Sequence, residues 1–575
     1  MELSFNIIKK NLKKDFSSLS IKKNIALLGD SPTQFFAQAL KAYGFEKDIE
    51  YAIYDADIDQ IDQQILDSSS ELYAHNPECI ILFESVYILK TKFYKSYSKD
   101  NFAEEYIARI KNYYEAIATV NVKTKILLLN FPELNDSVFG NYANKTTDSF
   151  LYQLRKINYM LMSLAMDNSN LFITDISSLY ASKGYEYATA RNLYINNGLV
   201  FSLDFSVLIA KTITDQVLAI HGKFNKCLIL DLDNTTWGGI IGDDGIENIQ
   251  IGELGIGKAF TELQKWAKQL KERGIILCIC SKNTESIAKE PFEKHPDMEL
   301  KLDDIAVFVA NWENKVDNIK FIQQVLNIGF DSMVFLDDNP FERNMVREAI
   351  PEITVPELPE DPSLYLPYVE SLNLFETASY SSLDKDRTTQ YQVEAQRNVL
   401  QKSFANEDEF LESLEMHSIV EPFNKFNIPR VAQLTQRSNQ FNLRTVRYTD
   451  EDAKLISENK EFKTFTFTLN DKYGEYGLIA MVILKELDTK NVFIENWLMS
   501  CRVLKRGMEN FTLNCLVNSY KNTNFEYLVG EYIQTPKNNL VKDHYEKLGF
   551  TLDTDGLWKL NINSYLEKEN YILKK

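Results

Sequence analysis

Pairs of aspartates close two short apolar segments of this chain. Asp231 and Asp233 end the segment KCLILDLD, and Asp337 and Asp338 end the segment SMVFLDD. Carboxylates this close repel one another unless a cation or a proton lies between them. Together they would form a hard oxygen site suited to Mg²⁺.

A hydroxyl and an ammonium group follow other segments of the same region. Ser281 comes directly after the apolar run GIILCIC, and Lys315 lies in NWENKVDN. These groups suit the remaining oxygens of a metal-bound phosphate. One Asp-x-Asp pair alone would be an ordinary strand-end turn, where Asp and Asn are common. The ordered set predicts phosphoryl chemistry instead.

Parallel strands are needed to bring these groups together. Polar residues follow the apolar strands of the middle region at their carboxyl ends, where open α/β sheets bind ligands. In the first region, strands at 24–30, 78–85 and 125–131 alternate with helical stretches, which predicts a parallel sheet covered on both faces. The last region has strands such as TFTFTLND and AMVILKEL before its helices.

We therefore predict a three-domain α/β chain. The first domain spans 1–222 and the second 223–374, both of α/β type. A helical connector spans 375–420, and an α+β domain spans 421–575.

Composition excludes several function classes. The chain has 575 residues and a net charge of −19, which argues against a nucleic-acid partner because phosphate attracts Lys and Arg. Its six cysteines form no CxxC pair, and no segment reaches the ~20 apolar residues of a membrane span. The amino terminus lacks a signal-peptide pattern. We expect a cytoplasmic protein.

The spacing of the motifs leaves no room for a cap domain. Asp231 and Ser281 are 50 positions apart, and Ser281 and Lys315 are 34 apart. An open site favours a phosphate presented on something large, or a lid supplied by a neighbouring domain.

The motif set resembles the haloacid-dehalogenase (HAD) superfamily. More specifically, the chain resembles the FkbH-like (HAD-IIIC) family through LDLDNTTWGGIIGDDG (230–245), CSKN (280–283), NWENK (311–315) and FLDDNPFER (335–343). The resemblance continues to QRSNQFNLRTVRY (436–448) and KNNLVKDHYEKLGF (537–550), so it covers about 224–552. It implies an uncapped, Rossmann-like HAD domain.

The resemblance implies a role for each motif residue. Asp231 would be the nucleophile, and Asp233 would protonate the leaving oxygen and then activate water. Mg²⁺ would be held by Asp231, the main-chain carbonyl of Asp233, Asp337 and Asp338. Ser281 and Lys315 would hold the phosphoryl oxygens, and Thr235 would brace the loop.

The resemblance also implies a function and a partner. The protein would dephosphorylate a small phosphorylated acyl donor of glyceryl type and load the acyl unit onto an acyl carrier protein, in polyketide or glycan biosynthesis. One alternative is an acyl-CoA-dependent N- or O-acyltransferase of surface glycan assembly with a subsidiary phosphatase domain. Another is a non-catalytic scaffold, against which the intact carboxylate set argues.

The C-terminal domain resembles a GNAT acetyltransferase in the segment HYEKLGF (544–550). In VLKRGMENF, Gly507 fits one glycine of the expected pyrophosphate loop, but Glu509 stands at the second. Arg437, Arg444 and Arg447 suit an anionic phosphopantetheine or CoA arm, or else form a solvated face. We expect this domain to face the open end of the sheet that bears Asp231 and Asp338.

Two further features leave alternatives open. Cys280 and Cys501 are candidates for a thiol that carries the acyl group, or else small buried hydrophobes. GDS (29–31) resembles the opening block of SGNH hydrolases, but no histidine lies three residues after an aspartate near the end of the first domain. Without a base, Ser31 stays a weak nucleophile. We expect an SGNH- or flavodoxin-like domain without hydrolase activity.

Overall fold

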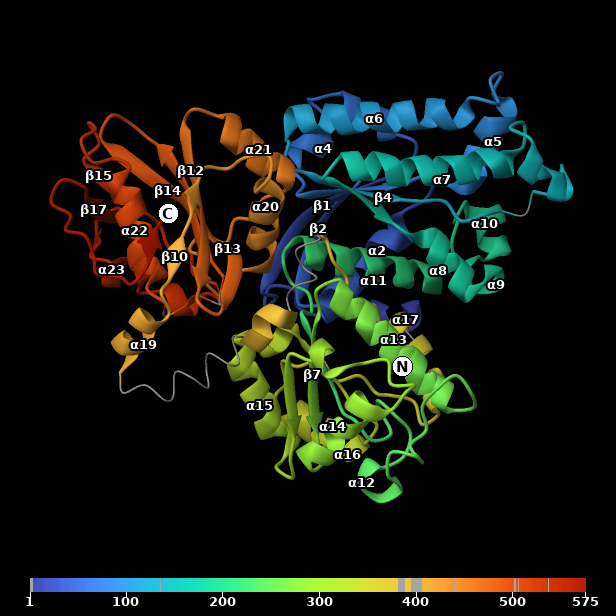
Figure 1. The fold of residues 1–575 in the computed structure, drawn as a ribbon. Helices are drawn as coiled ribbons and strands as arrows, with labels where there is room; N and C mark the ends of the chain where they lie inside the picture. The colour runs from blue at the N-terminus through green and yellow to red at the C-terminus, as the bar shows by residue number, and fades with distance from the viewer. Residues whose placement is uncertain are drawn as a thin grey trace. The chain divides into compact units, whose positions relative to one another are not determined.

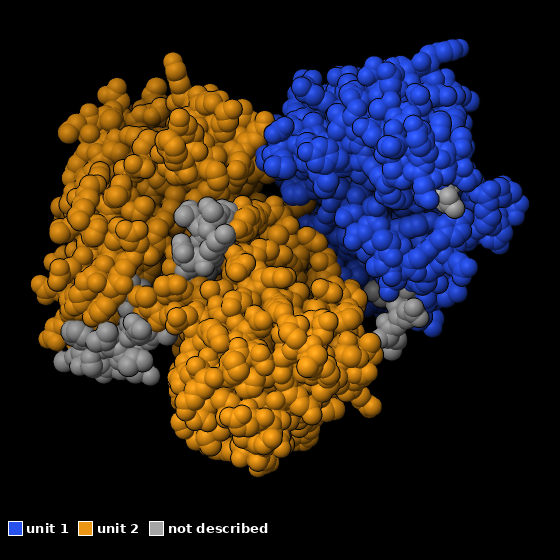
Figure 2. All heavy atoms as spheres, turned by 45° about the vertical axis from the view of Figure 1, so that its right-hand side comes forward, with its two compact units in different colours: residues 1–217 blue, residues 218–575 orange. Residues whose placement is uncertain are grey.

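The computed structural model describes residues 4–134, 136–380, 388–393, 406–438, 440–500, 503–504, 506–535 and 537–575. The chain forms two compact units, residues 1–217 and 218–575 (Figure 2). Each unit is described by itself. Figure 1 labels the elements.

The first unit is built on a five-stranded parallel sheet of order β2-β1-β3-β4-β5. Its strands are β1 (Ile21–Gly29), β2 (Ile49–Asp55), β3 (Cys79–Phe83), β4 (Lys125–Leu129) and β5 (Leu171–Thr174). The middle strand β3 is buried along its whole length, as expected of a strand covered on both faces. This is the strand order of flavodoxin-like folds.

One short helix precedes β1, and helices follow each of the strands. They are α1 (Phe5–Ile8), α2 (Gln34–Glu46), α3 (Ile61–Leu66), α4 (Glu71–Ala74), α5 (Val86–Lys95), α6 (Phe102–Val120), α7 (Phe150–Asp167), α8 (Ile176–Lys183), α9 (Tyr185–Ala188), α10 (Arg191–Asn197) and α11 (Leu203–Ile220). Buried residues of α5, α6 and α7 form one core with the sheet.

The second unit begins with a four-stranded parallel sheet of order β8-β7-β6-β9. Its strands are β6 (Cys227–Leu230), β7 (Ile276–Ser281), β8 (Val307–Ala310) and β9 (Met333–Leu336). The connecting helices are α12 (Ile241–Asp244), α13 (Gly257–Glu272), α14 (Glu285–Lys294), α15 (Lys315–Leu326), α16 (Pro340–Ala349) and α17 (Tyr365–Ser371). The sheet is a Rossmann-like α/β layer, buried on both faces.

The C-terminal part of this unit is a mixed nine-stranded sheet, of order β16-β17-β15-β14-β13-β12-β10-β18 with β11 beside β12. Its strands are β10 (His417–Ser418), β11 (Val420–Glu421), β12 (Phe462–Asp471), β13 (Gly474–Glu486), β14 (Asn491–Met499), β15 (Tyr527–Gly530), β16 (Thr551–Leu552), β17 (Trp558–Asn561) and β18 (Leu573–Lys574). Its helices are α19 (Glu407–Ser413), α20 (Ile428–Arg437), α21 (Asp450–Glu458), α22 (Met508–Asn518) and α23 (His544–Lys547).

The predicted fold class is confirmed, with two parallel α/β sheets and one mixed sheet. The C-terminal sheet begins at β10, within the segment that the sequence analysis assigned to the connector. No described helix has the length and apolar character needed to cross a membrane.

The C-terminal sheet domain contacts the end of the HAD-type sheet that lies opposite the aspartates. Lys226, just before β6, donates to the carbonyl oxygen of Arg437 at 2.7 Å. Asp331, just before β9, forms an ion pair with Lys537. The prediction that residues 421–575 face the carboxylate end is therefore wrong. The four residues of β6 span roughly 13 Å between the two ends.

Candidate active site

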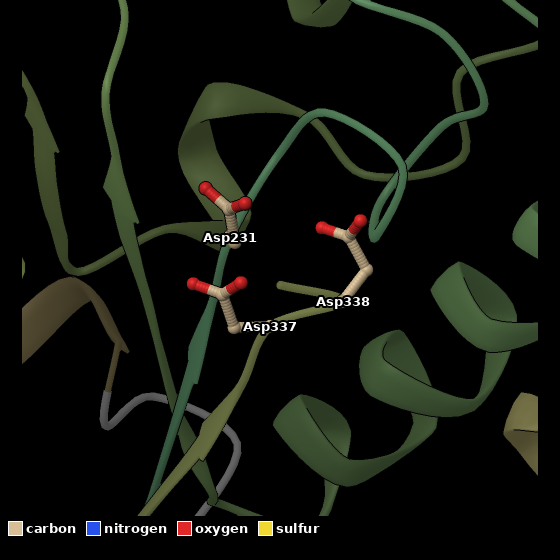
Figure 3. A group of neighbouring side chains, drawn as sticks. All are labelled: Asp231, Asp337 and Asp338. Carbon is tan, nitrogen blue, oxygen red and sulfur yellow. The ribbon is translucent and has the colours of Figure 1, made fainter. Parts of the chain in front are cut away.

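Strands β6 and β9 lie side by side and place three carboxylates at their carboxyl ends. Asp231 follows β6, and Asp337 and Asp338 follow β9. One oxygen of each lies within 4.8 Å of the others. Figure 3 shows the three side chains around one small space at the strand ends. The parallel register makes these sequence-distant groups neighbours.

Lys315 neutralises part of this charge. Its ammonium nitrogen lies 2.6 Å from Asp337 Oδ2 and 3.0 Å from Asp231 Oδ1. Lys315 is the first residue of α15, and its side chain is buried. Three ionised carboxylates against one ammonium leave a net charge of −2, which a divalent cation would balance.

Burial controls the protonation of the cluster. It raises the pKa of Asp231 to about 6, with Lys315 opposing the shift and Asp337 adding to it. Burial also raises the pKa of Asp337 and Asp338. Burial alone would lower the pKa of Lys315, but the two neighbouring carboxylates outweigh it and raise that pKa. Lys315 is therefore charged at neutral pH.

The residues of this cluster fit a magnesium ion. Asp231 Oδ1 is buried and makes no aligned hydrogen bond, although the ammonium of Lys315 lies close to it. A buried carboxylate oxygen without a full set of partners is costly. Carboxylate oxygens are the ligands that Mg²⁺ prefers.

Asp233 lies in the turn after Asp231 and is held by three donors. Its Oδ1 accepts from Trp237 Nε1 at 2.9 Å and from the Ile241 amide at 3.0 Å, and its Oδ2 accepts from Asn283 Nδ2 at 2.9 Å. Asn234 turns the chain there with a φ of +54°. Because Asp233 Oδ2 accepts from one donor while Oδ1 accepts from two, Oδ2 is the oxygen with room for a proton.

Asn283 joins Asp233 to Ser281. Its amide nitrogen lies 3.2 Å from Ser281 Oγ as well as 2.9 Å from Asp233 Oδ2. Ser281 is the last residue of β7, which pairs with β6. The sequence analysis did not single out Asn283, although it lies within the quoted motif CSKN.

Two residues brace the second aspartate pair. The Asp338 amide donates to Thr235 Oγ1 at 3.0 Å, which agrees with the bracing role predicted for Thr235. Arg343 Nη1 donates to the carbonyl oxygens of Asp337 and Asp338 at 2.8 and 2.6 Å. Arg343 is buried and was missed as a functional residue. Its place at the end of the motif FLDDNPFER (335–343) was the sequence signal that could have identified it.

Exposed apolar side chains follow all four strands at this end of the sheet. We name them the apolar rim, and they are Ile240, Ile287, Trp312 and Phe341. Trp312 is 74% exposed and Phe341 69% exposed. Each of them lies in the loop or helix that follows its strand.

Comparison with known proteins supports the relationship to the FkbH-like family. The family model described as FkbH, N-terminal domain, matches residues 24–218. A crystal structure of the N-terminal part of a Bacteroides fragilis protein, containing a phosphatase domain complexed with Mg, is 49% identical. The alignment covers 99% of that chain and 65% of this one, with a TM-score of 0.63.

This chain belongs to the FkbH-like family. No curated protein matches it. Solved acetyltransferases are similar to a smaller part of the FkbH-like chain. The ribosomal-protein-S18-alanine N-acetyltransferase of Escherichia coli is 15% identical, covering 98% of its chain and 26% of this one, with a TM-score of 0.20. The spermidine/spermine N-acetyltransferase of Vibrio cholerae is 12% identical, covering 94% and 25%, with a TM-score of 0.20. Similarity at that level carries no argument about activity.

The three arginines proposed for an anionic arm have different surroundings in the FkbH-like chain. Arg444 pairs with Glu495 at 3.0 Å and Glu531 at 2.8 Å. The Arg447 guanidinium donates to main-chain carbonyl oxygens, among them that of Ser438 at 3.0 Å, and burial lowers its pKa to about 10. Arg437 lines a cavity of about 520 Å³ at the contact with the HAD-type domain.

The loop before α22 offers little to a pyrophosphate. Gly507 begins the helix with a φ of +77°, which a glycine adopts without strain. Glu509 lies in the first turn of the helix, and burial raises its pKa. A carboxyl group at this helix start competes with any anion for the exposed amides.

A segment of the chain makes main-chain hydrogen bonds to β14 and to the chain that follows β15. These two strands pair in parallel only near their starts, from Asn491 to Phe493. Farther on, the Leu443 amide donates to Trp497 O at 3.2 Å, and the Ile533 amide donates to Leu443 O at 2.9 Å. The segment 441–443 thus bridges β14 and the chain that follows β15.

The two candidate thiols fall in different places. Cys280 is fully buried in the core beside Cys278, and burial raises the pKa of its thiol. Its sulfur lies 3.8 Å from the carbonyl oxygen of Lys315. Cys501 lies outside the described residues.

Ser31 follows β1 in the first unit and is buried, with no hydrogen-bond partner for its hydroxyl in the described part of the chain. The one histidine of this unit, His75, contacts the carbonyl oxygen of Ala52. The lack of hydrolase activity in this domain stays a prediction.

Proposed function

We propose that this protein is a Mg²⁺-dependent phosphatase that acts on a small phosphorylated acyl donor and passes the acyl unit to an acyl carrier protein. The observation that carries the phosphatase part is the carboxylate cluster of Asp231, Asp337 and Asp338 with Lys315 between two of its members. The 49% identical relative carries its phosphatase domain with Mg.

The residues divide the reaction between them. Asp231 attacks the phosphorus of a phosphate ester on a hydroxyl of the donor, forming a new P–O bond while the bond to the leaving hydroxyl oxygen breaks. Asp233 gives its proton to that oxygen and then takes one from the water that hydrolyses the aspartyl-phosphate. Asp231, Asp337, Asp338 and the Asp233 carbonyl would hold Mg²⁺, which offsets the repulsion between nucleophile and phosphate. The acyl unit is transferred in a separate step, in which the carrier thiol attacks the carbonyl carbon of the donor's acyl phosphate, loses its proton and releases inorganic phosphate.

Ser281 and Lys315 hold the phosphoryl oxygens in this proposal. Asn283 orients both Ser281 and Asp233 by its two hydrogen bonds. Lys315 is charged and already oriented by the carboxylates, so it contributes no reorganisation cost when phosphate charge develops.

The exposed side chains of the apolar rim are the reason to propose a large partner. An uncapped site with exposed apolar side chains on the segments that follow its four strands suits a carrier protein that covers the reacting group and excludes water. The C-terminal domain contacts the other end of the sheet, so a lid from that domain is not part of the proposal.

The alternative, an acyl-CoA-dependent transferase, has less support. Arg444 is held by two glutamates, and the segment 441–443 is bound by main-chain hydrogen bonds to β14 and to the chain after β15. Titration with acetyl-CoA distinguishes the two proposals, because only the transferase requires CoA binding.

Asp231→Asn tests the phosphatase site. It keeps the shape and removes the charge that attacks phosphorus, so hydrolysis of acetyl phosphate with Mg²⁺ should fall by several orders of magnitude. Asp303→Asn, at an exposed position away from the cluster, should keep full activity. Near-native turnover in Asp231→Asn would place the chemistry elsewhere.

Trp312→Ala tests the carrier. Acyl transfer to a holo-acyl carrier protein should fall at least tenfold while acetyl phosphate hydrolysis stays unchanged, because the side chain lies on the rim. Exposed Leu566→Ala in the C-terminal domain is the matched control. Equal transfer by both variants would remove the rim from the proposal without touching the phosphatase site.

A further inference from the structure

The first unit contains a cavity that the phosphatase proposal does not use. It measures about 1040 Å³ and is lined by residues of α5, α8, α9 and α10 and of the loop after β4. Helix α5 follows β3, and α8 follows β5, so the cavity lies at the carboxyl ends of the parallel strands. That end is where open α/β sheets bind ligands.

Every aromatic residue that lines this cavity is a tyrosine. Phenylalanine is more frequent than tyrosine in the chain, with 35 against 30, yet none lines the cavity. A tyrosine ring offers an apolar face and a polar edge. The lining tyrosines are Tyr87, Tyr94, Tyr180, Tyr185 and Tyr194.

Positive charge exceeds negative charge around the cavity. Lys90, Lys95 and Arg191 line it, against Glu133 as the only acidic lining residue. Arg155 already binds Glu133 through two nitrogens, at 2.6 and 2.7 Å. Lys90 pairs with Asp136 at 3.2 Å, which leaves Lys95 and Arg191 as the excess charge. An anionic group is therefore favoured.

Arg191 and the tyrosines are arranged for a ring-shaped ligand. The Arg191 guanidinium lies 5.4 Å from the centre of the Tyr194 ring, and the Tyr194 ring lies 4.4 Å from that of Tyr87. The hydroxyl of Tyr180 is buried and lacks a hydrogen-bond partner in the described part of the chain. Burial raises the pKa of Tyr180 to about 12, so this hydroxyl keeps its proton and can donate it.

We propose that this cavity binds a sugar that carries an anionic group, either phosphate or carboxylate. A sugar presents C–H faces to tyrosine rings and hydroxyls to their polar edges, which matches an all-tyrosine lining. Lys95 and Arg191 would bind the anionic group. A nucleobase fits less well, because the Tyr87 and Tyr194 rings already pack against each other, tilted by 35°, and leave no slot between them. This site is separate in chemistry from the phosphatase and goes beyond its function.

Ligand-observed NMR on the full-length protein tests the proposal. Saturation transfer is measured to glucuronic acid and glucose 6-phosphate, with glucose and AMP as comparisons, in EDTA so that the phosphatase cluster holds no metal. Both anionic sugars should show transfer to their ring protons and bind at least fivefold more tightly than glucose and AMP.

Two variants test whether the anionic sugars bind in this cavity. Tyr194→Ala and Arg191→Gln should each weaken binding of both anionic sugars at least fivefold. Tyr159→Ala, at an exposed tyrosine on α7 that does not line the cavity, should leave binding unchanged. Arg191 is exposed, so its replacement keeps the fold even if Tyr194→Ala does not.

Several outcomes would overturn the site. They are no transfer to either anionic sugar, equal or tighter binding of glucose or AMP, and unchanged binding in Arg191→Gln. Equal loss in Tyr159→Ala would also overturn it. The phosphatase proposal survives each of these results, because acetyl phosphate hydrolysis is measured separately.

Discussion

Asp30 shows how a single buried carboxyl group makes stability depend on pH. It follows β1 and is buried, and its Oδ1 accepts from the Ser85 amide at 2.7 Å. Its Oδ2 has no partner in the described part of the chain. Burial raises the pKa of Asp30 to about 7, with the Ser85 amide opposing and Glu84 adding to the shift.

The raised pKa of Asp30 determines the direction in which stability changes with pH. An acid whose pKa is higher in the folded protein holds its proton there after the unfolded chain has released it. Stability of the first unit therefore declines as pH rises from about 4 to about 7, between the unfolded and folded pKa values of Asp30.

Asp30→Asn should remove this decline. The amide keeps the acceptor for Ser85 and cannot ionise, so the gain in stability should be on the order of 2 kcal/mol larger at pH 8 than at pH 5. Hydrogen exchange of β1 and β3 amides, corrected for intrinsic rates, measures it. Asp67→Asn, at an exposed position in the same unit, is the control. A gain that is equal at both pH values would contradict the assigned pKa.

At the scale of elements, Arg343 on α16 positions the end of β9. It donates to the carbonyl oxygens of Asp337 and Asp338 and pairs with Glu357 at 3.0 Å. The planar guanidinium can reach these oxygens together, and an ammonium cannot. The helix thereby fixes the direction of both carboxylates.

Arg343→Lys should weaken Mg²⁺ binding about 10- to 100-fold, as loss of a group that orients metal ligands does. Isothermal titration calorimetry measures the affinity. Arg347→Lys is the matched control, because Arg347 lies one turn farther along α16 and donates to the Val355 carbonyl instead. Similar losses in both variants would show that only helix stability had changed.

Asn538 ties the 441–443 segment into the C-terminal sheet. Its amide nitrogen donates to Asn442 O and Ile533 O, each at 2.9 Å, and its oxygen accepts from the Thr535 amide at 2.8 Å. The side chain is fully buried. One residue therefore satisfies three main-chain groups that would otherwise lack partners.

Asn538→Ala should destabilise the C-terminal domain by about 2–4 kcal/mol, because it leaves these buried groups unpaired. Pulse proteolysis in a urea series, with cleavage sites read by mass spectrometry, measures the change. Asn510→Ala loses one exposed hydrogen bond to Glu569 O and should cost less than ~1 kcal/mol. Equal costs would mean that Asn538 does not hold the segment.

At the scale of the whole molecule, the two units should respond separately to metal. All five tryptophans lie in the second unit, so tryptophan fluorescence reports its unfolding alone. The carboxylate cluster belongs to the same unit, and the first unit contains no part of it.

Mg²⁺ at 100 times its dissociation constant should stabilise the cluster's domain by about 2.7 kcal/mol. The urea midpoint of a tryptophan transition should rise, and EDTA should reverse the rise. Hydrogen exchange in β1 to β5 should not change. The rise should be absent in Asp338→Asn, and a rise that persists there would place the metal elsewhere.

The candidate residues Asp231, Ser281, Asp337 and Asp338 were predictable because each lies at the end of an apolar run that a strand requires. Asp231, Ser281 and the Asp337–Asp338 pair lie at strand ends, and parallel strands end at one edge. Local patterning therefore determined the candidate site and the α/β class. Bracing residues such as Asn283 and Arg343 were less visible, since polar residues near motifs have many possible partners.

Only the tertiary structure decided the surroundings of the C-terminal arginines and the direction in which that domain makes contact. The pattern of charges in 436–448 is the same whether Arg444 and Arg447 face solvent or are bound by Glu495 and carbonyl oxygens. Which surface Lys226 and Asp331 contact depends on groups more than 200 positions away along the chain. Such contacts follow from how whole domains pack. The hydrophobic periodicity within one segment cannot predict them.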